Sequence, residues 1–136
     1  METPKVICDT DVMIDYLNNN SKRHLNTKTL MESFIGTENV VLSAVTKMEL
    51  IIGATHKKDM ERINKSILRY TVAFINDQIS QVAIQLLQDY KLSHGLAMAD
   101  ALIAATSIAT GFPLFTYNLK DYKFINTINL YNLKEK

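Results

Sequence analysis

Val6-Ile7-Cys8-Asp9-Thr10-Asp11-Val12 is the stretch that decides the fold, because a short apolar run stops at an acid and a helical pattern begins. Val12, Ile14 and Leu17 follow among helix-compatible residues. We therefore predict a buried strand at residues 6–8 and a helix at residues 12–17. Ligands of parallel sheets bind beyond the carboxyl ends of the strands. Asp9 stands at such an end and is the first acid of a candidate site.

Short apolar runs alternate with helical patterns along the rest of the chain. Further strands are predicted at residues 40–42, 71–74, 114–116 and 128–130. Helices are predicted at residues 27–35, from Ser43 to Gly53, at residues 56–70, from an N-cap at Asp77 through Tyr90, and at residues 97–110. Strands that are continuously apolar and alternate with helices predict an α/β domain with a mainly parallel central sheet.

The composition is that of one globular domain, which we expect to span residues 1–136. With 47% hydrophobic and 21% charged residues, the chain has no apolar run long enough to cross a membrane, and its first residues lack a signal-peptide pattern. We therefore expect a cytoplasmic protein without a membrane contact. A single cysteine, Cys8, excludes a disulfide framework and a thiolate metal cage. The net charge of +1 requires any polyanion binding to come from local clusters.

Two of the candidate acids have competing structural explanations. Asp9 can cap the helix that follows it, although Thr10 or Asp11 can supply that cap equally well and leave Asp9 free. Glu49 closes the pattern Thr46-Lys47-Met48-Glu49, which is typical of a capping box. From the residues alone, the capping explanation is the better one for Glu49.

The other acids lie in the second half of the chain. Asp100 sits among small apolar residues of a helix buried on several sides, where a carboxylate needs a partner. Asn118 and Asp121 follow the strand predicted at residues 114–116, although both types are also common in turns. Acids from several elements suit Mg²⁺ or Mn²⁺, which prefer oxygen ligands and retain water. The three histidines show no zinc-ligand spacing.

Four blocks of the sequence together resemble the PIN-domain family, and in particular its VapC-type toxins. The blocks are residues 9–12, residues 43–50 with Gly53, residues 94–106 and residues 116–122. The resemblance implies a sheet with helices on both faces and an endoribonuclease that depends on Mg²⁺ or Mn²⁺. It further implies that the chain is the toxin of a type II toxin–antitoxin system, which cuts RNA, often a transfer RNA, and inhibits translation. A cognate antitoxin and a homodimer are the implied partners.

The resemblance also implies which residues form the site. Asp9, Glu49 and Asp100 match the invariant acids of the family, and they would be catalytic residues and metal ligands. Either Asp121 or Asn118 would complete the set. Thr116 would supply a hydroxyl that hydrogen-bonds a metal ligand. Asp11 departs from the family, which usually has a small polar residue there, and it would either add charge to the site or cap a helix.

Basic residues in the middle of the chain are candidates for contacts with the RNA backbone. Lys58, Arg62, Lys65 and Arg69 recur at a spacing that aligns them on one face of a helix. The alternative is an ordinary solvated helix face. The adjacent Lys22 and Arg23 form a weaker second candidate.

Two other functions compete with the nuclease. The first block also resembles the nucleophile motif of haloacid-dehalogenase-type phosphatases, in which Asp9 would attack phosphate and Asp11 would act as the acid. However, the late block from Thr116 to Asp121 lacks the adjacent carboxylates of that family. The other alternative is a catalytically inactive module that binds RNA or protein.

Overall fold

A sheet of four parallel strands forms the centre of the computed structural model, which describes residues 4–131. The strands are β1 (Val6–Cys8), β2 (Val40–Ser43), β3 (Thr71–Ala73) and β4 (Leu114–Phe115). Their order across the sheet is β3-β2-β1-β4, and every pairing is parallel. Because all four strands run in one direction, their carboxyl ends meet at the same edge.

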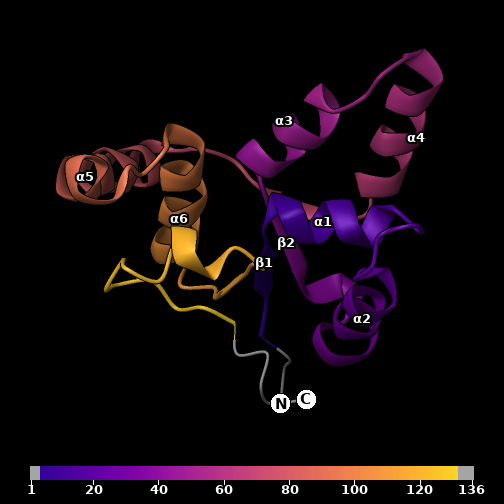
Figure 1. Cartoon of the computed structure of the whole chain (residues 1–136), viewed down its shortest axis with the longest axis horizontal. Helices are drawn as coiled ribbons and strands as arrows, with labels where there is room; N and C mark the ends of the chain where they lie inside the picture. The colour runs from indigo at the N-terminus through magenta and orange to yellow at the C-terminus, as the bar shows by residue number, and fades with distance from the viewer. Residues whose placement is uncertain (1–3, 132–136) are drawn as a thin grey trace.

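Helices cover both faces of this sheet. They are α1 (Thr10–Leu17), α2 (His24–Thr29), α3 (Ala44–Ile52), α4 (Lys57–Ile67), α5 (Asp77–His94) and α6 (Met98–Thr110). Shorter helical segments are η1 (Leu30–Ile35), which has π-helical hydrogen bonding, and the 3₁₀ turns η2 (Thr37–Asn39) and η3 (Leu119–Asp121). In Figure 1, α5 and α6 lie on one side of β1 and β2, and α1, α2 and α4 lie on the other.

Successive side chains of β1 enter two separate hydrophobic cores. Val6 and Cys8 pack in the core that contains residues of α1 and α4, whereas Ile7 packs in the core that contains residues of α5 and α6. β2 and β4 divide their side chains between the same two cores. Burial on both faces explains why the strands are continuously apolar. The prediction of an α/β fold with a parallel sheet and helices on both faces is confirmed.

Two predicted helices differ from the structure at their ends. The second predicted helix starts earlier, at His24, and changes to π-helical hydrogen bonding from Leu30 to Ile35. The helix predicted at residues 56–70 ends at Ile67, where the chain turns toward β3. The last positions of that prediction therefore lie outside α4.

Two predictions in the second half of the chain need correction. The N-cap of α5 is Asn76 rather than Asp77, because the Asn76 side-chain oxygen accepts the Ile79 amide at 2.9 Å. The last predicted strand is reduced to one parallel bridge between Leu130 and Leu114, since β4 itself is only two residues long. In the part of the chain that the structure describes, no helix combines the length and apolarity needed to cross a membrane.

Candidate active site

Asp9 follows β1 directly and is the N-cap of α1. Only 4% of this residue is exposed, and its carboxylate accepts hydrogen bonds from the Thr10 amide at 2.7 Å and the Thr116 hydroxyl at 2.8 Å. The interpretation that a neighbour caps the helix and leaves Asp9 free is therefore wrong. Carboxylate oxygens have more than one lone pair each, so both can still accept a further partner.

The carboxyl group of Asp9 is costly to ionise. Burial, followed by the negative charge of Asp11, raises the pKa of Asp9 to about 6, although the hydrogen bonds from Thr116 and Thr10 oppose the rise. A cation bound at Asp9 would stabilise the ionised form directly.

Asp11 joins the start of α1 to the end of β4. One of its carboxylate oxygens accepts the Val12 amide at 2.8 Å, and the other accepts the Tyr117 amide at 3.0 Å. Burial is the main cause that raises the pKa of Asp11. Asp11 therefore accepts one helix amide, that of Val12, although it is not the N-cap, and it adds negative charge that acts on Asp9.

Glu49 lies well inside α3, and the capping-box interpretation is wrong. Ser43, the last residue of β2, is the N-cap of α3, and its hydroxyl accepts the Val45 amide at 3.0 Å. The Glu49 carboxylate is thus free of a capping role and accepts a hydrogen bond from the Thr10 hydroxyl. The Thr46 hydroxyl lies 3.0 Å from the same Thr10 oxygen. Glu49 is therefore attached to α1, immediately beside Asp9.

Asp100 lies in the first turn of α6 and is half-buried. Its Oδ1 accepts a hydrogen bond from the hydroxyl of Tyr122 at 3.2 Å. Burial raises the pKa of Asp100, and the negative charges of Asp9, Asp121 and Glu49 raise it further, whereas the bond from Tyr122 lowers it. The charges of these three acids thus act together on the Asp100 carboxylate.

The two candidates for the fourth acidic position have different environments. Asn118 is exposed, and its backbone amide donates to the Thr116 hydroxyl at 3.0 Å. Asp121 is half-buried in η3, and its charge acts on Asp100. This arrangement favours Asp121 as the fourth carboxylate, with Asn118 supporting Thr116 through its backbone.

The carboxylate oxygens of the site fit a hard divalent cation that takes its remaining ligands from water or substrate. Among residues 4–131, no group of three or more His, Cys, Asp or Glu is arranged so that it could hold a metal ion. Mg²⁺ is usually bound through one or two carboxylates together with water and substrate phosphates, so a group of three is not required. A bound cation would offset the negative charges that act on Asp100.

The predicted basic stripe is present in part. Lys58, Arg62 and Lys65 are exposed on α4, but Arg69 lies beyond the end of the helix, so the four residues do not share one helix face. Arg62 also donates to Asp59 at 2.7 Å.

The second basic candidate is engaged within the molecule. Arg23 forms an ion pair with Asp15 at 3.0 Å, and its guanidinium carbon lies 4.2 Å from the centroid of the Tyr117 ring. Lys22, next to it, is exposed.

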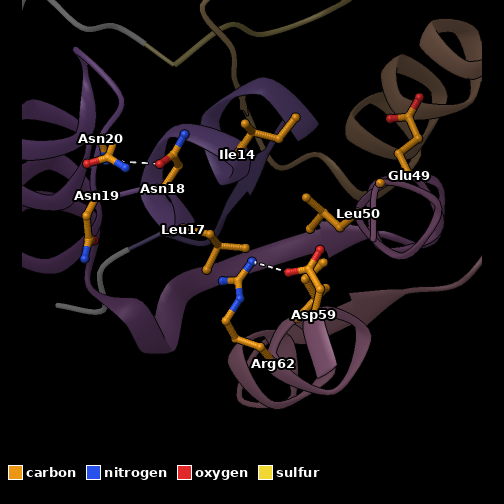
Figure 2. Close-up of a pocket in the computed structure, with 11 residues that line it drawn as sticks. Ile14, Leu17, Asn18, Asn19, Asn20, Glu49, Leu50, Asp59 and Arg62 are labelled. Atoms are coloured by element: carbon orange, nitrogen blue, oxygen red, sulfur yellow. Dashed lines mark hydrogen bonds and ion pairs between the residues drawn. The ribbon is translucent and has the colours of Figure 1, made fainter. Parts of the chain in front are cut away.

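A pocket of about 530 Å³ lies between α1, α3 and α4, and it reaches Glu49 at one end (Figure 2). It is lined by Ile14, Leu17, Asn18, Asn19, Asn20, Glu49, Leu50, Gly53, Asp59, Arg62 and Ile63. Apolar side chains, three amides and the Asp59–Arg62 pair thus surround one cavity beside the acids. Sequence reasoning gave residues 18–20 no role and missed this pocket.

Three hydroxyl groups at the acids were also missed. The Thr10 hydroxyl donates to Glu49 and contacts the Thr46 hydroxyl, and the Tyr122 hydroxyl donates to Asp100. Their positions in the sequence could have indicated them, because each of these residues lies inside one of the four sequence blocks that contain the acids.

The sequence is similar to known proteins along most of its length. The family model described as "PIN domain" matches residues 6–125. Over 131 residues, the chain is 28% identical to a protein named Ribonuclease VapC1 from Methanocaldococcus jannaschii, covering 95% of this chain and 87% of that protein.

Solved structures show the same architecture. A toxin–antitoxin complex from Klebsiella pneumoniae contains a chain that is 26% identical, with a TM-score of 0.73, covering 89% of this chain and 92% of that one. A chain of VapBC2 from Rickettsia felis, solved with a DNA fragment from its promoter, is 20% identical, with a TM-score of 0.72 and coverages of 93% and 97%. The second likeness supports the fold alone.

Proposed function

The chain belongs to the PIN domain family, and from this membership and its acidic site we propose that it is a divalent-metal-dependent endoribonuclease of the VapC type. The observation that carries the proposal is the gathering of acids at the carboxyl edge of the sheet. Burial first, and then the charges of Asp9, Asp121 and Glu49, raise the pKa of Asp100. A shared cation would offset this repulsion.

In this mechanism the acids would bind the metal ion, and one of them would also orient water. Asp9 and Asp100 would hold Mg²⁺ or Mn²⁺, with Glu49 and Asp121 acting as ligands directly or through water. The bound ion would supply an activated water and charge stabilisation at the phosphodiester. Glu49, whose carboxylate accepts the Thr10 hydroxyl, would orient that water. The water would attack phosphorus in line with the leaving oxygen, whose bond to phosphorus would break, without a covalent enzyme intermediate.

The rival phosphatase mechanism needs Asp11 as a proton donor. Both carboxylate oxygens of Asp11 accept backbone N–H groups, so both are engaged within the protein, although burial raises the pKa of this carboxyl group. Membership of the PIN domain family also argues against this mechanism. Phosphate release from a small monoester, without cleavage of RNA, would favour the phosphatase.

RNA would approach the acids along α4. Lys58, Arg62 and Lys65 are exposed there, and Arg62 also lines the pocket that reaches Glu49 (Figure 2). Cations on this path would contact backbone phosphates while the scissile bond lies at the acids. Arg69 and the Lys22–Arg23 pair are left as weaker candidates. Replacing Lys58 and Lys65 with Gln is expected to weaken RNA binding and to reduce its dependence on salt.

The biological role we propose is that of a toxin restrained by a protein antitoxin. The relative named Ribonuclease VapC1 and the toxin–antitoxin complex from Klebsiella pneumoniae support it. Cleavage of a structured RNA such as a transfer RNA would inhibit translation in the cytoplasm. We also propose a homodimer, and light scattering of the pure protein would measure it. Expression is expected to stop growth, and coexpression of a cognate antitoxin is expected to restore it.

Cleavage of RNA by the pure protein tests the proposed activity. We expect fragments with Mn²⁺ or Mg²⁺ and none with EDTA, and we expect Asp9→Asn to be inactive because it removes a charged ligand. Cleavage that survives EDTA would contradict the metal-dependent mechanism. Metal binding without cleavage of any RNA would support the inactive binding module instead.

A further inference from the structure

Tyr122 brings one polar atom from a hydrophobic core to the acidic site. Only 1% of this residue is exposed, and its ring packs in the core that contains Ile7 and Ala101. Its hydroxyl donates to Asp100 Oδ1 at 3.2 Å. The side chain therefore links β1, α6 and the segment after β4.

Hydrogen bonds of the Tyr122 amide and carbonyl hold its backbone in place. The Tyr122 amide donates to the Leu119 carbonyl at 3.1 Å, and the Tyr122 carbonyl accepts the Ile125 amide at 2.9 Å. The surrounding core restricts rotation of the ring, because close packing leaves few alternative rotamers. Asp100, in contrast, is half-buried, and its carboxylate can rotate unless a partner holds it.

The hydroxyl is a donor to the acids of the proposed site. It donates to Asp100 Oδ1, and it opposes the rise in the pKa of Asp9 that burial causes. A hydrogen bond that a hydroxyl donates to a carboxylate stabilises the negative charge on that carboxylate.

We propose that Tyr122 is a positioning residue, whose hydroxyl holds the Asp100 carboxylate in the orientation in which Asp100 and Asp9 take up a divalent metal ion. This inference rests on the proposed function. Partners that hydrogen-bond metal ligands fix the orientation of those ligands, and their loss typically weakens metal binding by about 10- to 100-fold. Tyr122 acts through Asp100 and does not touch the scissile bond.

Metal binding by Tyr122→Phe tests the inference without RNA. The substitution removes only the hydroxyl, and we expect the Kd for Mn²⁺, measured from the EPR signal of free Mn²⁺, to rise about tenfold or more. Tyr90→Phe is the matched control, because Tyr90 packs against the same core, and its Mn²⁺ affinity is expected to equal that of the wild type. In cleavage assays the half-saturating Mn²⁺ concentration should rise by the same factor as the Kd, while kcat at saturating Mn²⁺ should change little.

The outcomes separate the inference from the proposed function. A lower melting temperature of Tyr122→Phe with an unchanged Mn²⁺ Kd would mean that the hydroxyl is only structural, and it would overturn the inference while the nuclease assignment stands. A wild-type protein that neither binds Mn²⁺ nor cleaves RNA would overturn the proposed function and the inference together.

Discussion

Asp9 combines a structural task with a proposed chemical one. Asp9 follows the last residue of β1, and its carboxylate caps α1. It is also the most buried acid of the site. Local sequence could place it at the end of a strand but could not choose among three adjacent capping residues. The second oxygen of its carboxylate accepts the hydroxyl of Thr116, which lies 107 positions away in the chain. No local pattern contains such a contact.

Asp9→Asn is expected to stabilise the metal-free protein at neutral pH. A pKa raised from 3.8 to about 6 corresponds to about 3 kcal/mol in favour of the neutral form. Loss of one of the two hydrogen bonds that Asp9 accepts offsets about 1 kcal/mol. The net expected gain, measured by urea unfolding in EDTA at pH 7.5, is about 2 kcal/mol.

The pH dependence of this gain gives a second check. Because folding raises the pKa of Asp9, its contribution to stability is fully present below pH 3.8 and is lost as the pH rises through about 6. The advantage of Asp9→Asn should therefore shrink at pH 5, where wild-type Asp9 is largely protonated. A difference that does not change with pH, or a less stable variant at pH 7.5, would contradict the electrostatic account.

At the scale of elements, the first turn of α3 shows where the capping pattern failed, although the helix was predicted to begin at Ser43. Thr46 and Glu49 have capping-box spacing, yet Ser43 caps the helix at the point where β2 ends. The strand end determines the helix start, and strand ends depend on pairing across the sheet. In the folded chain Thr46 is fully buried and its hydroxyl contacts Thr10, so the residues of the apparent capping box support the site instead.

Gly95 is the C-cap of α5 and begins the turn that leads to α6, whose first turn contains Asp100. Its φ is +68°, in the left-handed region, and its amide donates to the Lys91 carbonyl at 2.8 Å. A Cβ there would meet no atom within 4 Å, so Gly95→Ala is expected to cost about 1 kcal/mol of stability through backbone strain alone.

Gly53→Ala is the control for this prediction. Gly53 has a helical φ of −72°, and a Cβ at this position would make ordinary contacts. Its free energy of unfolding should stay equal to that of the wild type or rise slightly. Equal stability of the two alanine variants in urea unfolding would show that the α5–α6 turn carries no strain.

At the scale of the whole molecule, the sequence predicted the fold class better than its details. Continuous apolar strands alternating with helices indicated a parallel α/β sheet, and the four sequence blocks indicated the family. The strand order β3-β2-β1-β4 was not predictable, because it depends on pairing between distant segments. The pocket beside Glu49 was missed for the same reason, since α1, α3 and α4 meet only in three dimensions.

The central claim is that the gathered acids make this chain a metal-dependent ribonuclease. The most direct measurement compares RNA cleavage by the wild type, Asp100→Asn and the exposed control Asp89→Asn, in Mn²⁺ and in EDTA, with folding verified by circular dichroism. We expect Asp100→Asn to lose activity by more than about a hundredfold, because it removes a proposed metal ligand rather than an outer partner. Asp89→Asn should cleave like the wild type and stop in EDTA. If Asp100→Asn cuts RNA as fast as the wild type, the assignment of the site is wrong.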